Sequence, residues 1–538
     1  MKSKFFVYAL ASMAFAACSD DNEVTDNGGA VVNPTGEAYV SLSINTPTGT
    51  RALNTPDQEN ATSDESTVKT LKVIFFDSSN NVVASGVKDW TVGTDPEAGD
   101  PNQPTGTPGK AFKVDAAAIK VLVVANPIAA FNPSDGQNYA TVNAALTATA
   151  AEVSTVTNFM MSNASGELAP HAANLTSHST KEAAEAAPLE INIDRVVAKV
   201  RVYTAKRTST FAAISDEGWV LNVTNKKFYP CSERVMTAVG TLTPFDQYGL
   251  GSYRKDPNYD TQSDPTVAAY AENYDSYTST STPTWINPCD ATLAGKPQYC
   301  LENTQEATYN LHAYTTQVLF KAVVSPTNLT DVDGGTYDIT PGDDWIAINS
   351  QYYSYDKLVE YIEKELTNKY SSSDPSLYTN PLFDQLRGYV TDVLGASATV
   401  PEIDKSVTTA LNGTTTPTLD DKVKEYITAL TADRAAVAAA ANRAKKVGNL
   451  SYYAGGVNYY KIMIEHDNDN GGAQNNALGE FGVVRNSVYD VNIKAVKHPG
   501  YPIIPAPDPT VPDEDNNAWL SVQININPWT WYSQEVEL

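Results

Sequence analysis

The chain between residues 36 and 51 reads Gly-Glu-Ala-Tyr-Val-Ser-Leu-Ser-Ile-Asn-Thr-Pro-Thr-Gly-Thr-Arg. Val40, Leu42 and Ile44 alternate with small polar residues, and this period of two is typical of a half-buried β-strand. The turn-rich residues that follow end at Arg51, so a protease could remove the strand from a domain that has already folded. The sequence therefore predicts a removable strand, whose loss would leave an open groove that favours polymerisation.

The residues before this strand predict export. Two early lysines precede an apolar run that is too short to be a comfortable membrane span. The run ends in Phe-Ala-Ala-Cys at residues 15–18, which resembles the lipobox of bacterial lipoproteins, where an acylated cysteine becomes the new N-terminus. We therefore expect lipid on Cys18, and the alternative is an ordinary signal peptide in which this cysteine has no role.

Composition limits the classes of partner. The 538 residues include 37 basic and 63 acidic side chains, which gives a net charge of −26. Such a charge disfavours nucleic acid or an anionic membrane surface as a partner. Hydrophobic residues make up 42% of the chain, which is enough for sizeable cores in the two to four domains that this length allows.

Cysteine usage leaves the disulfide state open. Cys231, Cys289 and Cys300 remain once Cys18 is assigned to lipid, and an exported protein can form a disulfide. Cys289 and Cys300 are the nearer pair in sequence, but free thiols are an equal alternative. The chain has no Cys-x-x-Cys motif, which disfavours structural zinc.

Apolar runs with alternating or continuous burial patterns predict a mainly β fold. The run at 189–202 is long enough to close a first domain and to begin a second one. The predicted strands lie at 68–77, 82–85, 118–127, 159–162, 189–202, 219–223, 316–324 and 459–464.

Residues 354–446 break the β pattern. Leu358, Ile362 and Leu366 recur every four residues, and Ser354 or Asp356 can cap the helix that they predict. We interpret this region as a helical insertion in the second β domain. It is either a partner-binding surface or a cover for a sheet edge.

The sequence offers no motif for catalysis. The five histidines have no spacing typical of a metalloprotease, and there is no nucleophile elbow, phosphate-binding loop or dinucleotide-binding loop. Residues 466–472 resemble a calcium loop superficially, but their glycine comes too early and Glu480 does not close the loop, so we favour a solvated turn. We expect a protein that is not an enzyme and that uses no cofactor or metal.

The end of the chain mirrors the removable strand. One face of this predicted strand carries Leu520, Val522, Ile524 and Ile526. After Pro528, Trp529 and Trp531 take the opposite phase, which indicates a bend or bulge. A Pro-rich and therefore stiff spacer at 499–509 precedes the strand. The segment is either a strand donated to a neighbour or the last hairpin of its own domain, and its spacing alone does not separate the two.

Taken in order, several segments resemble the fimbrillins of Bacteroidota, the FimA/Mfa-type major fimbrial subunits that build type V pili. The segments that carry the resemblance are the lipobox, Thr-Gly-Thr-Arg-Ala at 48–52, the strand at 68–77, Val-Leu-Val-Val-Ala-Asn at 121–126, Arg-Val-Val-Ala-Lys-Val at 195–200, Tyr-Cys-Leu-Glu-Asn-Thr at 299–304, and 482–493 before the terminal strand. The resemblance is weakest in the helical insertion.

The resemblance implies a fold and a maturation route. It implies two transthyretin-like β-sandwich domains, the second with the helical insertion, in a protein exported as a lipoprotein. An arginine-specific extracellular protease would cut between Arg51 and Ala52 and remove the first strand. A strand from another subunit would then fill the groove, and the segment 519–538 matches the donor.

These expectations divide the chain and define its role. The predicted divisions are a signal peptide at 1–18, a propeptide with the removable strand at 19–51, an N-terminal β-sandwich at 52–188, a C-terminal β-sandwich at 189–498 with the helical insertion at about 354–446, and a spacer with terminal donor strands at 499–538. The expected role is a structural pilin subunit of a cell-surface fimbrium, made as an outer-membrane lipoprotein precursor. Its expected partners are its own copies, accessory pilins, the maturation protease and host or bacterial surface ligands. The alternatives are a tip or accessory adhesive pilin and, less favoured, a glycan-binding surface lipoprotein.

Overall fold

The structure is a computed structural model. It describes residues 36–45, 59–92, 111–163, 173–204, 207–234, 253–259, 267–289, 296–306, 310–358, 360–361, 364, 450–466, 479–512 and 520–530. The predicted positions Cys18, Arg51, Ala52 and Trp531 lie outside these residues. Among the helices of the described part, none combines the length and the apolar content needed to span a bilayer.

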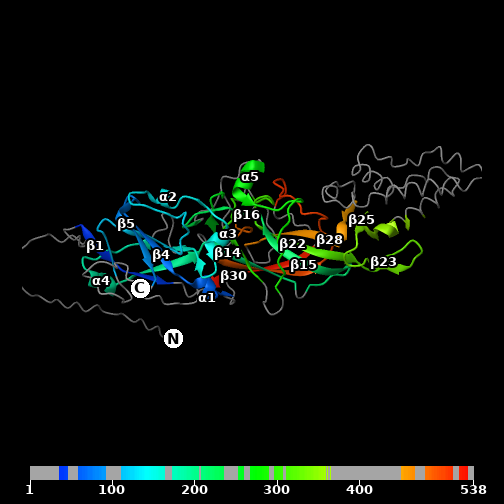
Figure 1. Cartoon of the computed structure of the whole chain (residues 1–538), viewed down its shortest axis with the longest axis horizontal. Coiled ribbons are helices and arrows are strands. Elements are labelled where there is room, and N and C mark those ends of the chain that lie inside the picture. The colour runs from blue at the N-terminus through cyan, green and yellow to red at the C-terminus, as the bar shows by residue number, and fades with distance from the viewer. Residues whose placement is uncertain are drawn as a thin grey trace, which may run out of the picture.

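The described residues form an elongated, mainly β molecule, which confirms the predicted fold class (Figure 1). β1 and α4 lie toward one end of the long axis, and β23 and β25 lie toward the other end. Two large hydrophobic clusters fill the two halves, and both are built mainly from strand residues. The number of domains and their boundaries stay predictions.

The N-terminal half is organised by a seven-stranded sheet, here called the N-terminal sheet. Its order is β2 (Leu42–Asn45), β13 (Leu189–Arg195), β11 (Met161–Asn163), β7 (Lys120–Ala125), β4 (Thr70–Phe76) and β5 (Val82–Thr91), with β12 (Ala173–Asn174) also on β7. The other elements of this half are β1 (Glu37–Val40), β3 (Glu59–Asn60), β6 (Phe112–Asp115), β8 (Leu146–Thr147), β9 (Ser154–Thr155), β10 (Asn158–Phe159), α1 (Ser63–Ser66), α2 (Tyr139–Val142), α3 (Ala150–Val153) and α4 (Lys181–Ala186).

The C-terminal half contains a five-stranded sheet, here called the C-terminal sheet, and a three-stranded sheet. The C-terminal sheet has the order β21 (Gln298–Leu301), β14 (Val197–Tyr203), β29 (Ser487–Val496), β30 (Leu520–Thr530) and β3. The three-stranded sheet has the order β15 (Ala212–Asn222), β22 (Gln317–Pro326) and β28 (Val457–Met463). Trp219, Phe320, Tyr460 and Tyr489 are fully buried in the cluster that the two sheets share.

Shorter elements complete the C-terminal half. They are β16 (Thr224–Asn225), β17 (Lys227–Phe228), β18 (Glu233–Arg234), β19 (Arg254–Lys255), α5 (Val267–Asn273), β20 (Tyr274–Asp275), β23 (Leu329–Thr330), β24 (Thr336–Tyr337), β25 (Trp345–Ile348), β26 (Gln351–Ser354), β27 (Ser451–Tyr453) and the 3-10 helix η3 (Ala454–Gly456). Residues 355–358 are helical, and the Ser354 hydroxyl accepts a hydrogen bond from the backbone N–H of Lys357 at 3.2 Å. Ser354 therefore caps this helix, as predicted. Most of the remaining insertion lies outside the described residues.

The long run at 189–202 forms two strands in two different sheets. β13 belongs to the N-terminal sheet and β14 to the C-terminal sheet, and only Val196 separates them. Val196 and Arg195 are fully buried. The two halves are therefore joined by almost continuous strand backbone, not by an exposed linker.

Two predicted strands are longer than expected. The strand predicted at 82–85 is the ten-residue β5, and the strand predicted at 219–223 is the end of the eleven-residue β15. β15 contains an irregularity between Ser215 and Gly218. The polar residues at this bulge break the alternation of apolar side chains, which is why the first part of β15 was not predicted.

All three described cysteines are free and buried, so Cys289 and Cys300 do not form a disulfide. Both lie beside β14, where Cys300 is opposite Ala198 and Cys289 is opposite Tyr203. Five residues of extended strand separate these two positions, or roughly 16 Å. A disulfide requires Cα atoms within about 7 Å of each other.

The Pro-rich spacer does not extend away from the molecule. Residues 499–512, here called the strap, lie on the outer face of the three-stranded sheet. The backbone N–H of Gly500 donates to Asn458 at 2.9 Å, Tyr501 forms a bridge with Tyr459, and Ile504 is buried against Leu319. The proline residues keep the strap extended. Its Ile504 side chain and its backbone hydrogen-bonding groups nevertheless find their contacts within the same chain.

Ile504→Ala should lower the free energy of unfolding by about 2–5 kcal/mol, because it removes a buried side chain from the strap contact. The matched control is Ile503→Ala, since Ile503 is only half-buried and should cost less. Urea unfolding followed by tryptophan fluorescence measures both changes. Equal effects of the two substitutions would contradict this description of the strap.

Candidate functional site

The predicted removable strand pairs with two different sheets. We call residues 36–45 the leader strand. Its first part, β1, runs antiparallel to β6, with Val40 opposite Phe112. Its second part, β2, runs parallel to β13 at the edge of the N-terminal sheet, with Leu42 opposite Leu189. One short segment therefore completes backbone pairing on two separate strands.

The apolar face of the leader strand is buried, as the alternation predicts. Val40 and Leu42 are each 1% exposed and Ile44 is 4% exposed, and all three belong to the N-terminal core. Ser41 is also buried, at the point where the chain passes from β6 to β13. Burial of each aliphatic side chain contributes about 1.5–3 kcal/mol. The leader strand is therefore part of the core, and its removal from the protein stays a prediction.

Backbone bonds that the sequence did not predict hold the middle of the leader strand. Tyr39 and His178 exchange two backbone hydrogen bonds of 2.8 and 2.9 Å. The backbone N–H of Leu189 donates to the carbonyl oxygen of Ser41 at 2.8 Å. Loss of the leader strand would leave these donors and acceptors without their partners. The site can therefore bind an extended polypeptide through its backbone and an apolar trough.

The predicted donor segment pairs within its own sheet in this structure. β30 runs antiparallel to β29, from Ser487 opposite Pro528 to Val496 opposite Leu520. Of the two alternatives, the structure therefore shows the last strand of the chain's own sheet. Val522, Ile524 and Ile526 lie within this pairing, and their donation to another subunit stays a prediction.

β30 continues without a break through Pro528, where a bend or bulge was predicted, and the irregularity in its pairing with β29 lies instead between Ile493 and Ala495. After Pro528, the backbone of Trp529 and Thr530 pairs in parallel with Glu59 and Asn60 of β3. β3 thus brings a segment just downstream of the predicted cleavage site next to the end of the terminal strand. This pairing of distant segments was not predicted from the sequence.

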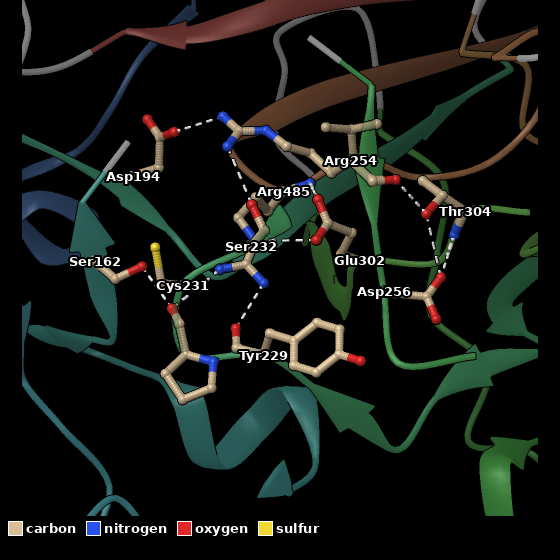
Figure 2. Close-up of polar contacts among 12 residues, drawn as sticks. Ser162, Asp194, Tyr229, Cys231, Ser232, Arg254, Asp256, Glu302, Thr304 and Arg485 are labelled. Atoms are coloured by element: carbon tan, nitrogen blue, oxygen red, sulfur yellow. Dashed lines mark hydrogen bonds and ion pairs between the residues drawn. The ribbon is translucent and has the colours of Figure 1, made fainter. Parts of the chain in front are cut away.

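A buried ionic cluster lies at the junction of the two halves (Figure 2). Arg485, which precedes β29, forms an ion pair with Glu302 at 3.2 Å, and both side chains are 1% exposed. The guanidinium also donates to the carbonyl oxygens of Tyr229 and Pro230. Because a buried charge without a partner costs several kcal/mol, this pair fixes the path of three separate segments.

A second ion pair holds the same segment from the other side. Arg254 donates to Asp194 at 2.9 Å and to the Ser232 hydroxyl at 3.1 Å, as Figure 2 shows. The carbonyl oxygen of Pro230 also accepts a hydrogen bond from Ser162. Residues 229–232 therefore cross from the C-terminal half and pack on the N-terminal half.

Asp256 is a further buried carboxyl group of the cluster. Its oxygens accept hydrogen bonds from the backbone N–H groups of Thr304 and Asn258, both at 2.6 Å. Burial raises the pKa of Asp256 to about 7, and these hydrogen bonds oppose that rise. In the described part of the chain, no three acidic, histidine or cysteine side chains are grouped to hold a metal ion. The geometry of the cluster supports a structural role.

The sequence did not identify this cluster. Glu302 lies in the quoted segment 299–304, but its partner Arg485 is 183 residues away. Charged residues such as these most often lie on a solvated face. Only the approach of the two halves makes them a buried pair.

Another buried polar contact lies close to Arg485. The Tyr489 hydroxyl accepts a hydrogen bond from the backbone N–H of Val484 at 2.9 Å and lies 2.7 Å from Nδ1 of His466. The hydroxyl can then donate its proton to Nδ1, which requires a neutral imidazole. Burial lowers the pKa of His466 to about 3, which agrees with this assignment.

The family described as major fimbrial subunit protein (FimA) matches residues 38–192. The family described as major fimbrial subunit protein type IV, fimbrillin, C-terminal matches residues 451–535. The first match contains most of the leader strand and β13, and the second contains β29 and β30. Among curated proteins, none matches the sequence.

Solved structures of bacterial surface proteins are also similar. A fimbrilin (FimA) from Porphyromonas gingivalis W83 has 14% identity and a TM-score of 0.36 over 92% of this chain and 98% of its own. The tip fimbrial protein Mfa3 from Porphyromonas gingivalis has 13% identity and a TM-score of 0.32 over 92% and 100%. A putative cell adhesion protein from Parabacteroides distasonis has 12% identity and a TM-score of 0.40 over 92% and 99%.

Leu42→Ala should lower the free energy of unfolding of the uncut protein by about 2–5 kcal/mol, because Leu42 is buried in the core. Ser43→Ala is the matched control on the half-buried face of the same strand. Urea unfolding of both variants measures the difference. A cost for Leu42→Ala no larger than that for Ser43→Ala would show that the leader strand is not part of the core.

The contribution of His466 to stability should fall as the pH drops from about 6.5 to about 3, because this side chain takes up a proton in the unfolded chain before it does so in the folded protein. The raised pKa of Asp256 acts in the opposite direction, so the contribution of His466 is measured as a difference between variants. His466→Gln should remove this part of the acid dependence. Tyr489→Phe should keep it, since the imidazole stays buried. Urea unfolding at a series of pH values measures the slopes, and an unchanged slope in His466→Gln would contradict the assignment.

Proposed function

Because this chain belongs to the fimbrillin family, we propose that it is a structural pilin subunit of a cell-surface fimbrium, matured after Arg51 and polymerised by strand exchange. Fimbrial assembly follows from the family. The cleavage, the exchange of strands and the absence of enzymatic activity are our proposals. The precursor is exported as an outer-membrane lipoprotein with its lipid on Cys18.

The leader strand is the observation that carries this proposal. It contributes the buried side chains of Val40, Leu42 and Ile44, and it pairs with both β6 and β13. A cut between Arg51 and Ala52 would separate it from the rest of the chain, but not from its contacts. A strand with the same period of apolar residues can replace it and restore the backbone hydrogen bonds.

The proposed strand exchange also identifies the donor strand and the partners. The donor is the segment 519–538, with Leu520, Val522, Ile524 and Ile526 on one face and Trp529 and Trp531 after Pro528. It enters the groove of another copy or of an accessory pilin. An arginine-specific protease performs the cut, and the finished fibre presents its surface to host or bacterial ligands.

Limited digestion with trypsin tests the proposal. Trypsin should cut the purified protein after Arg51, and the product should form SDS-resistant ladders on electrophoresis. Arg51→Ala should be neither cut at this position nor form ladders. Arg51→Lys is the matched control, because trypsin cuts after lysine whereas an arginine-specific protease does not. Normal ladders from Arg51→Ala would show that strand release does not drive assembly.

A tip or accessory pilin is the second candidate, and one observation favours it. β30 is fully paired with β29 in its own sheet, so the terminal strand has a place within the chain. A tip subunit accepts a strand but donates none.

Mixing separates the two candidates. The Arg51→Ala variant keeps its leader strand, so its groove stays closed, but it still has its terminal strand. If the chain is a shaft subunit, this variant should donate its terminal strand to a growing fibre and then stop the growth of that fibre. Added to trypsin-treated wild type, it should shorten the ladders if the chain is a shaft subunit. Unchanged ladders would favour a subunit that does not donate.

A further inference from the structure

We infer that residues 59–66 form a clamp that fixes the exit of the terminal strand at the junction, with Glu65 as its positioning residue. This inference rests on the proposed function only for its consequence in assembly. The clamp itself is defined by contacts within one molecule. It consists of β3, Ala61, Thr62 and the short helix α1.

The clamp holds the terminal strand through its backbone. Glu59 and Asn60 of β3 pair in parallel with Trp529 and Thr530, the last two residues of β30. A pairing of two residues is too short to be stable by itself. Its position must therefore be set by the residues that follow β3.

Those residues are anchored by Glu65, which is 3% exposed. Its carboxylate forms an ion pair with Lys199 of β14 at 2.9 Å and accepts a hydrogen bond from the Tyr299 hydroxyl of β21 at 2.7 Å. It also accepts the backbone N–H of Thr62 at 2.8 Å, and its own carbonyl oxygen accepts from Arg195 at 2.7 Å. The C-terminal sheet thus binds the carboxylate of Glu65, and Arg195 of the N-terminal sheet binds its backbone carbonyl.

The charge state of Glu65 agrees with this anchoring. Burial by itself would raise the pKa of Glu65, but Lys199, together with hydrogen bonds from Thr62 and Tyr299, outweighs burial and lowers it. The carboxylate is therefore ionised at neutral pH. An ionised carboxylate that binds an ammonium group and two hydrogen-bond donors holds a fixed position.

The N-terminal half holds the same segment from the other side. Ala61 is 1% exposed and belongs to the N-terminal core. The carbonyl oxygen of Asp64 accepts the backbone N–H of Thr157 at 2.9 Å, and that of Thr67 accepts from Asn126 at 2.8 Å. The clamp therefore has a fixed place relative to both sheets, and it holds the end of β30 in register with them.

The position of the clamp determines where the chain leaves the molecule. Pro528, two residues before the end of β30, is opposite Ser487, which directly follows Arg485 and Asn486 of the junction. β30 therefore ends at the junction, near the middle of the long axis (Figure 1). In a fibre, the position of this end would set the reach of the tail toward a neighbouring groove.

Hydrogen–deuterium exchange of the uncut monomer tests the clamp. Glu65→Gln should speed the exchange of the amides at 529–530 about tenfold, because the carboxylate that positions β3 is lost. The amides of the leader strand at 37–45 should keep their wild-type rates. They report whether the core remains folded.

Glu152→Gln is the matched control. Glu152 of α3 also accepts the backbone N–H of the residue before its helix, Thr149, at 2.6 Å, but this helix is not next to β30. It should leave the exchange at 529–530 unchanged. If Glu65→Gln unfolds the protein because the buried Lys199 loses its ion pair, the double variant Glu65→Gln with Lys199→Met removes both charges and takes the place of the single variant in this comparison.

Unchanged exchange at 529–530 in the folded variant would overturn the clamp. So would acceleration of equal size along the leader strand, which would show a general loss of stability. After trypsin treatment, the clamp variant should be cut after Arg51 at the wild-type rate but give shorter ladders. If the wild type itself forms no ladders, the proposed function fails, whereas the exchange comparison still decides the clamp.

Discussion

The pairing of backbone groups at sheet edges is the constraint on which this structure depends. The edge of the N-terminal sheet at β13 is closed by the leader strand, and the edge of the C-terminal sheet at β29 is closed by β30. Both covering strands come from the ends of the described chain. Unpaired strand edges attract other chains, so each end of this protein controls an edge that would otherwise be available.

The two sheets are coupled because β13 of one and β14 of the other share one run of backbone. β13 and β14 are separated only by Val196, and the residues around this point are held by Arg485, Glu302 and Arg254. A structural change in one half therefore acts on a rigid, charged junction and not on a loose linker. Buried ion pairs add little net stability over apolar packing, but they require a defined geometry between the two charged groups. That property suits a joint between two halves whose relative position must be defined.

Sequence reasoning succeeded where the signal was local. The alternation of Val40, Leu42 and Ile44 predicted a buried strand face, and Ser354 predicted a helix cap. It failed where the outcome depended on distant segments. The spacer was expected to be stiff because of its prolines, but its sequence did not say whether it reaches a neighbour or packs on its own domain. In the structure Ile504 packs beside Leu319. The first part of β15 was missed because a bulge interrupts its pattern.

The sequence by itself determined the mainly β class, the apolar face of the leader strand and that of the terminal strand, because side-chain periodicity reports which face of a strand is buried. It could not determine which edge each strand covers, since two strands of the same period are interchangeable in sequence. The tertiary structure decided that β30 lies beside β29 and that β3 meets its end. It also decided that Glu302 and Arg485 are buried together, because only the approach of two halves removes water from charges that are far apart in the chain.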